Sequence, residues 1–171
     1  MTYSIAEHIP INFDALSRVW IYQCSRLFLM SESLEIEDMS NDFVDRWQSH
    51  GAKVKGYANL IFGQFLIIMA DETQAGVSGC STDSSVHLVK NIEQKFKVSM
   101  FDRQNLAFIV NQKIQLMPLA QLNYAIQNNF ITTDTIYFNN MVQTKQELLQ
   151  SWMIPVKDSW LMRKIKPLQI A

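Results

Sequence analysis

Along the first 110 residues, some segments have apolar residues at the spacing typical of strands, and others have them at the spacing typical of helices. Residues 18–24, RVWIYQC, are rich in β-branched and aromatic side chains, which predicts a strand. A helix is expected to begin near Ser31, where acidic residues follow a capping serine, and to end at Gly51. Its apolar stripe has helical spacing and consists of Ile36, Met39, Phe43 and Trp47.

The segments that follow predict two further strands, a second helix and another strand. Residues 53–62 alternate between apolar and polar positions, and the wholly apolar FLIIMA, residues 65–70, suits a strand in the middle of a sheet. A second helical stripe runs from Val86 to Phe96, and LAFIV, residues 106–110, is the next strand. The order β-α-β-β-α-β is that of ferredoxin-like folds. We therefore expect an α+β protein with a ferredoxin-like body over residues 1–111.

Residues 112–171 are expected to form a C-terminal β/α extension packed on this body, as part of one compact unit. KIQLM, residues 113–117, returns as a hairpin partner through a turn at residues 111–112. TIYF, residues 135–138, is a brief strand, and the capping box Thr144-Lys-Gln-Glu147 opens a last helix. An edge strand at 113–117 could pair two copies, but nothing in the sequence sets the oligomeric state.

The stretch AGVSGCSTDSS, residues 75–85, combines glycines, hydroxyl side chains and a cysteine. Such residues commonly cap helices, so a well-capped turn before the second helix is one interpretation. An anion site is the sharper hypothesis, because the unpaired backbone N–H groups at a helix start attract phosphate or carboxylate. The ligand-binding residues of that site would be Arg18, Gly76, Ser78, Gly79, Ser81, Thr82 and Ser84.

Cys80 in this stretch is also a candidate catalytic nucleophile. A thiol at a helix N-terminus has a lowered pKa, and His50 would act as its base while Asp83 or Asp71 orients the imidazole. In a ferredoxin-like fold the end of the first helix, the end of the third strand and this stretch share one end of the sheet. The competing interpretation is a small buried cysteine that only fills space.

Composition and charge argue against several classes of protein. The formal net charge is −1 and the basic residues are scattered, so no nucleic-acid partner is expected. The longest apolar run, residues 65–70, is far shorter than the ~20 residues of a membrane helix. The two cysteines form no CxxC pair, so we expect neither a metal site nor a cofactor. The first residues lack a signal-peptide pattern, from which we expect a cytoplasmic protein with two free thiols.

Several motifs together resemble a family of short bacterial proteins of unassigned activity, often labelled ABC transporter ATPases. They are RVWIYQ, GCSTDSSV, FDR, IYFNN with VQTKQEL, and W-x-x-P-x-x-D-S-W at residues 152–160. The resemblance runs over nearly the whole chain. The sequence has no G-x-x-x-x-G-K-[ST], the motif that supplies the phosphate-binding lysine and the magnesium-binding hydroxyl, so ATPase activity is not expected.

A second resemblance covers residues 118–138, which are similar to GYF-like modules. In those modules a P-x-x-x-L helix leads to an I-x-x-D-T strand. The matching residues are Pro118, Leu122, Ile131, Asp134 and Thr135. This resemblance implies a surface for protein interaction.

Three functions therefore stay open. The favoured one is a non-catalytic ligand-binding or regulatory domain that takes a small anion at the 71–85 loop. The second is a small cysteine-dependent enzyme that uses Cys80 and His50. The third is an interaction module whose protein partner contacts Trp152 and Trp160, although burial in the core is the commoner fate of such side chains.

Overall fold

The computed structural model describes residues 3–73 and 79–166, without the side chains of residues 79–81. The chain forms two compact units. The first, called the N-terminal unit below, comprises Tyr3–Phe101 and Asn140–Leu149. The second, the C-terminal unit, comprises Asp102–Asn139 and the described residues from Gln150 onward.

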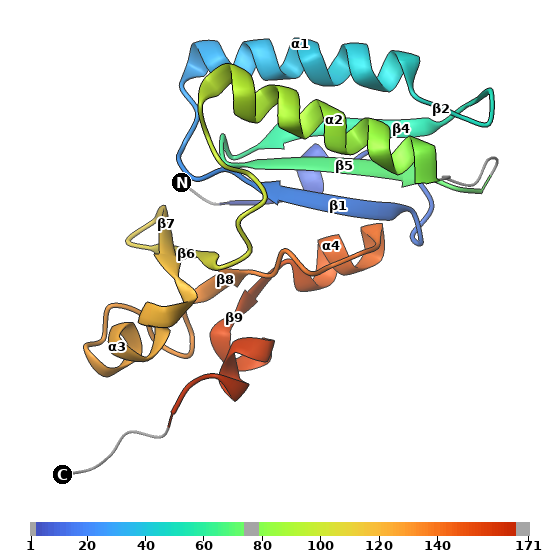
Figure 1. Cartoon of the computed structure of the whole chain (residues 1–171). Coiled ribbons are helices and arrows are strands. Elements are labelled where there is room, and N and C mark those ends of the chain that lie inside the picture. Colours follow the sequence, from blue (N-terminus) through green and yellow to red (C-terminus); the bar gives the residue numbers. More distant parts are fainter. Residues whose placement is uncertain (1–2, 74–78, 167–171) are drawn as a thin grey trace. The chain divides into compact units, whose positions relative to one another are not determined.

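The N-terminal unit contains a three-stranded antiparallel sheet in the order β1-β5-β4, with two helices on one of its faces (Figure 1). The two helices run in opposite directions. The elements are β1 (Arg18–Gln23), β4 (Lys55–Ile61), β5 (Phe65–Asp71), α1 (Met30–Arg46) and α2 (Gly79–Phe96). The combination of helices and antiparallel strands confirms the predicted α+β class.

Strand β5 lies in the middle of this sheet, as its uninterrupted apolar sequence predicted. All seven of its residues are buried, because it pairs with β1 on one side and with β4 on the other and is covered on both faces. Leu66, Ile68 and Ala70 join the core beneath the two helices. The alternate residues, Phe65, Ile67 and Met69, are just as fully buried on the opposite face.

The four-stranded order of a ferredoxin-like body is not confirmed. In a ferredoxin-like body the fourth strand lies beside the first, but β6 (Asn105–Val110) belongs to a separate sheet in the C-terminal unit. Its backbone groups are used by the adjacent hairpin strand β7 (Lys113–Pro118) and by β8 (Ile136–Phe138). The free side of β1 instead meets residues 143–144, where the Val19 N–H donates to the Gln143 carbonyl at 2.8 Å and Arg18 forms an antiparallel bridge with Thr144.

Helix α1 begins and ends differently from the prediction. The residue before its first turn is Leu29, and the Glu32 carboxylate accepts a hydrogen bond from the Leu29 N–H at 2.8 Å, a capping role that had been expected of a serine. The helix ends at Arg46 rather than at Gly51. A small hairpin follows, with β2 (Gln48–Ser49) and β3 (Ala52–Lys53) joined through His50 and Gly51, both at positive φ. Gly51 therefore lies in the turn of this hairpin and does not end the helix.

The C-terminal unit has a four-stranded antiparallel sheet in the order β7-β6-β8-β9. The predicted hairpin is confirmed, with Asn111 and Gln112 at φ 49° and 59° in its turn. The core of the C-terminal unit includes Phe108, Leu122 and Tyr137. The remaining elements of this unit are η2 (Leu119–Gln121), α3 (Leu122–Gln127), β9 (Met153–Pro155), η3 (Val156–Asp158) and η4 (Trp160–Arg163).

Two further short helices complete the described elements, η1 (Ala6–His8) and α4 (Lys145–Ser151). The capping box predicted for the latter is present in modified form. The Glu147 N–H donates to Thr144 Oγ1 at 3.2 Å, and the Glu147 carboxylate accepts from the Gln143 N–H at 2.7 Å. In the part of the chain that the structure describes, every helix is too short or too polar to span a membrane.

Candidate functional site

A groove of about 520 Å³ lies between α1 and α2 in the N-terminal unit. Its floor is apolar and consists of Met39, Phe43, Trp47 and Leu88. Its rim is polar and consists of Asp42, Arg46, Gln48, Ser84, His87 and Asn91. The groove thus combines a surface for an apolar group with several hydrogen-bonding side chains.

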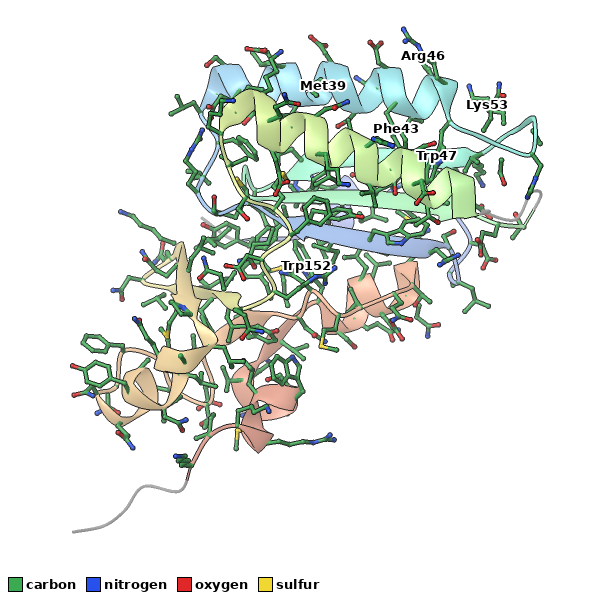
Figure 2. All side chains as sticks on the ribbon, in the orientation of Figure 1. Met39, Phe43, Arg46, Trp47, Lys53 and Trp152 are labelled. Atoms are coloured by element: carbon green, nitrogen blue, oxygen red, sulfur yellow. The ribbon has the colours of Figure 1, made fainter. Side chains whose placement is uncertain are left out.

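The floor is built by the apolar stripe of α1 and by the residue that follows the helix. Met39 and Phe43 are half-buried, and Trp47 is only 2% exposed. The rings of Phe43 and Trp47 are 4.8 Å apart between centroids and inclined by 38°, and Trp20 meets Trp47 edge-on at 6.3 Å. Figure 2 labels the α1 side of the groove, from Met39 to Trp47. Because these rings pack on one another, the floor is a fixed aromatic surface.

Two opposite charges stand one helical turn apart on the α1 side of the rim. Asp42 and Arg46 are both exposed. Among the described residues, neither of them has an ion-pair partner within 4.0 Å. The Arg46 guanidinium, which can bind a carboxylate through two parallel hydrogen bonds, is therefore available to a ligand.

The predicted anion site overlaps this groove only in part. Ser84 lines it, Thr82 lies half-buried in the same helix, and Gly79 is the first residue of α2. Gly76 and Ser78 lie outside the described residues, as does the side chain of Ser81. The 71–85 anion site accordingly stays a prediction.

The predicted nucleophile and base also stay a prediction, because the Cys80 side chain lies outside the described part of the structure. His50 is exposed at the tip of the β2–β3 hairpin, and Asp83 is exposed on α2. His87 lines the groove. Arg46 and Asp42 were missed altogether, although their spacing of four residues on one helix was visible in the sequence.

Arg18, the remaining predicted ligand-binding residue, has contacts within the N-terminal unit. Its guanidinium lies 3.5 Å from the Glu72 carboxylate and 5.0 Å from the centre of a ring of Trp20. A ligand at this end of the sheet would compete with Glu72 for Arg18.

Asp71 is a structural residue. Its carboxylate is buried and accepts hydrogen bonds from Lys55 Nζ at 2.6 Å, Thr73 Oγ1 at 2.7 Å and the Asp14 N–H at 3.2 Å. The bond from Lys55, followed by that from Thr73, holds the pKa of the Asp71 carboxyl far below its usual range. These bonds occupy the carboxylate, so Asp71 is not placed to orient a catalytic histidine.

Cys24 is expected to resist alkylation in the folded protein. Its side chain is completely buried, and burial raises the pKa of its thiol. Iodoacetamide labelling followed by mass spectrometry should modify Cys24 only after the chain is unfolded in urea. The same spectra report on Cys80, whose labelling at pH values well below ~8.5 would support the nucleophile hypothesis. Equal labelling of Cys24 in folded and unfolded protein would contradict the packing described here.

Trp152 is a core residue, as the commoner fate of such side chains suggested, and does not offer the surface that an interaction module would need. Trp152 is 0% exposed and packs edge-on against Phe138, with 5.1 Å between ring centroids. Trp160 is half-buried, and its Nε1 donates a hydrogen bond to the Tyr137 hydroxyl at 3.2 Å. The aromatic pair that is exposed in this unit was missed, namely Tyr124 and Phe130, which stack 6.2 Å apart.

Among the described residues, no cluster of three or more histidine, cysteine or acidic side chains could hold a metal ion. The rim of the groove offers neutral hydrogen-bonding groups, the Arg46 guanidinium and the Asp42 carboxylate. Compared with known proteins, the chain matches no protein-family model, no curated protein and no solved structure.

Proposed function

We propose that the protein is a non-catalytic domain that binds a small molecule in the groove between α1 and α2. The single observation that carries this proposal is the pairing of a fixed aromatic floor with a polar rim in one hollow of about 520 Å³. Small-molecule sites are typically concave, mostly apolar and roughly 300–1,000 Å³ in volume, with a few polar groups that orient the ligand. The groove matches this description in its volume and in its apolar floor, and its rim supplies the polar groups that would orient a ligand.

The proposal keeps the class of function favoured by the sequence but moves the site along α2. Ser84 and His87, which line the groove, belong to α2, the helix at whose start the sequence suggested a ligand. The small anionic ligand expected there is carried over to the groove as part of the proposal.

We expect flat aromatic fragments to bind in this groove. Saturation-transfer NMR with a panel of such fragments would identify binders, and an Asn91→Phe variant should remove their signals because the new ring fills the groove. Gln94→Phe is the matched control, since Gln94 is exposed on the same helix but does not line the groove. Fragments that bind Asn91→Phe as well as the wild type, or a panel without binders, would overturn the proposal.

The proposed fold of the N-terminal unit is a variant of the ferredoxin-like arrangement. Support comes from the order β1-β5-β4, from two helices on one face, and from the antiparallel bridge between Arg18 and Thr144. In this variant, residues 143–144 take the place of the fourth strand. The first helix crosses from β1 to β4 on the face where the groove lies.

A further inference from the structure

We propose that the ligand of the groove is a flat, apolar molecule with a single carboxylate, and that Arg46 binds this carboxylate. The inference rests on the proposed function, and it adds the chemical class of the ligand. Three features of the groove carry it: the shape of the floor, the donors of the rim, and the acidic side chain next to Arg46.

The floor favours a flat apolar body. Phe43 is half-buried and offers its ring to the groove, while Trp47, which is 2% exposed, stacks against that ring at 4.8 Å and 38° and backs it. Met39 and Leu88 complete the apolar floor. An aromatic ring in the ligand can pack on such a surface in offset or edge-on contact. Trp47 is held from behind by Trp20, so the surface does not have to be formed when the ligand binds.

The rim favours an acceptor at one end of the ligand. Arg46 carries N–H donors only, because a guanidinium has no acceptor of its own, and the Asn91 amide can donate as well. No ion-pair partner of Arg46 occurs among the described residues, so a ligand carboxylate would not displace an internal one. A hydrogen-bonded ion pair at the edge of an apolar groove is stronger than one in open solvent.

Asp42 limits the charge of the ligand. It lies one turn before Arg46 on the same helix and also lines the groove. A doubly charged group such as a phosphate monoester would be repelled by Asp42 more strongly than a carboxylate. The combination of one guanidinium and one carboxylate on the rim therefore fits a monoanion.

The test compares 2-naphthoate with 2-naphthamide, which has the same rings but no charge. Isothermal titration or NMR titration should give tighter binding of the carboxylate to the wild type. Arg46→Gln should weaken 2-naphthoate binding by about three- to tenfold, between the effect of an ion pair in open solvent and that of a well-formed charge-assisted hydrogen bond, and leave 2-naphthamide within about twofold. Asp42→Asn should strengthen 2-naphthoate binding, because it removes a repulsive charge.

Lys90→Gln is the matched control for charge, because Lys90 is exposed on α2 but does not line the groove. It should leave both affinities unchanged. Equal binding of the two probes, or an Arg46→Gln variant that binds 2-naphthoate like the wild type, would overturn the carboxylate inference and leave the groove as a site for neutral ligands. If neither probe binds, or if Asn91→Phe does not remove their binding, the proposed function fails together with this inference.

Discussion

Replacing Asp71 with asparagine is expected to lower the free energy of unfolding by about 2–3 kcal/mol at neutral pH, the magnitude typical of a hydrogen bond to a charged group at a part-buried site. The Asp71 side chain is 2% exposed, whereas that of its partner Lys55 is 35% exposed. Lys55 would keep its bond to the Asn12 carbonyl but lose its counter-ion. The N-terminal segment would also lose the bond from the Asp14 N–H to a charged acceptor.

The same carboxylate makes the stability depend on pH in a defined direction. The pKa of Asp71 is lowered in the folded protein, chiefly by Lys55, so the unfolded chain takes up a proton more readily than the folded one. The stabilisation is therefore fully present above the unfolded aspartate pKa of about 3.9 and is lost as the pH falls below it. The difference in stability between the wild type and Asp71→Asn should accordingly shrink in acid.

Urea unfolding followed by tryptophan fluorescence, at neutral pH and at a series of acidic values, would measure both effects. Glu72→Gln is the matched control, because this neighbouring carboxylate is more exposed and pairs with Arg18 at the longer distance of 3.5 Å. Its loss should change the stability by less than about 1 kcal/mol, as for most surface ion pairs. A difference between wild type and Asp71→Asn that stays constant from neutral pH into acid would contradict the role given to the Lys55 bond.

The apolar pattern predicted most of the individual elements but not how all of the strands pair. β5 was recognisable because a strand buried on both faces has no polar positions. β6 and its hairpin partner β7 were both recognised, but the pairing of β6 with its second neighbour, the strand β8, was not, because that pairing joins segments that no short turn connects. Residues 143–144 reach the edge of β1 from more than a hundred positions away, and no local pattern indicates this.

The candidate site was harder to predict for a related reason. The sequence drew attention to the glycines and the cysteine of the 71–85 loop, since these residue types are distinctive on their own. The groove is made instead of ordinary helix residues, and only the packing of α1 against α2 brings Arg46 and His87 to one hollow. Trp47 was recognised as part of an apolar stripe and is buried, but a stripe does not show that its residues also lie beneath a groove.

Gly56→Ala is expected to destabilise the protein by about 2–3 kcal/mol, the upper part of the usual range for overpacking a well-filled core. A Cβ atom at this position would lie 2.5 Å from Cε3 and 3.0 Å from Cζ3 of Trp47. The indole cannot move away easily, because Phe43 and Trp20 pack against it. Gly56 is not among the residues with positive φ, so the strand backbone itself would accept alanine.

Two further variants separate this steric effect from backbone strain. Gly51→Ala places the same methyl group where nothing lies within 4 Å but φ is +80°, so its cost should be only that of the strained backbone, about 1 kcal/mol. Trp47→Phe removes the six-membered part of the indole that the new Cβ would meet. In that background Gly56→Ala should cost much less than in the wild type, a coupling that urea unfolding of the four variants of the cycle measures directly. Additive losses in the cycle would mean that Trp47 is not held against β4 as described, and the fixed floor of the groove would be lost with it.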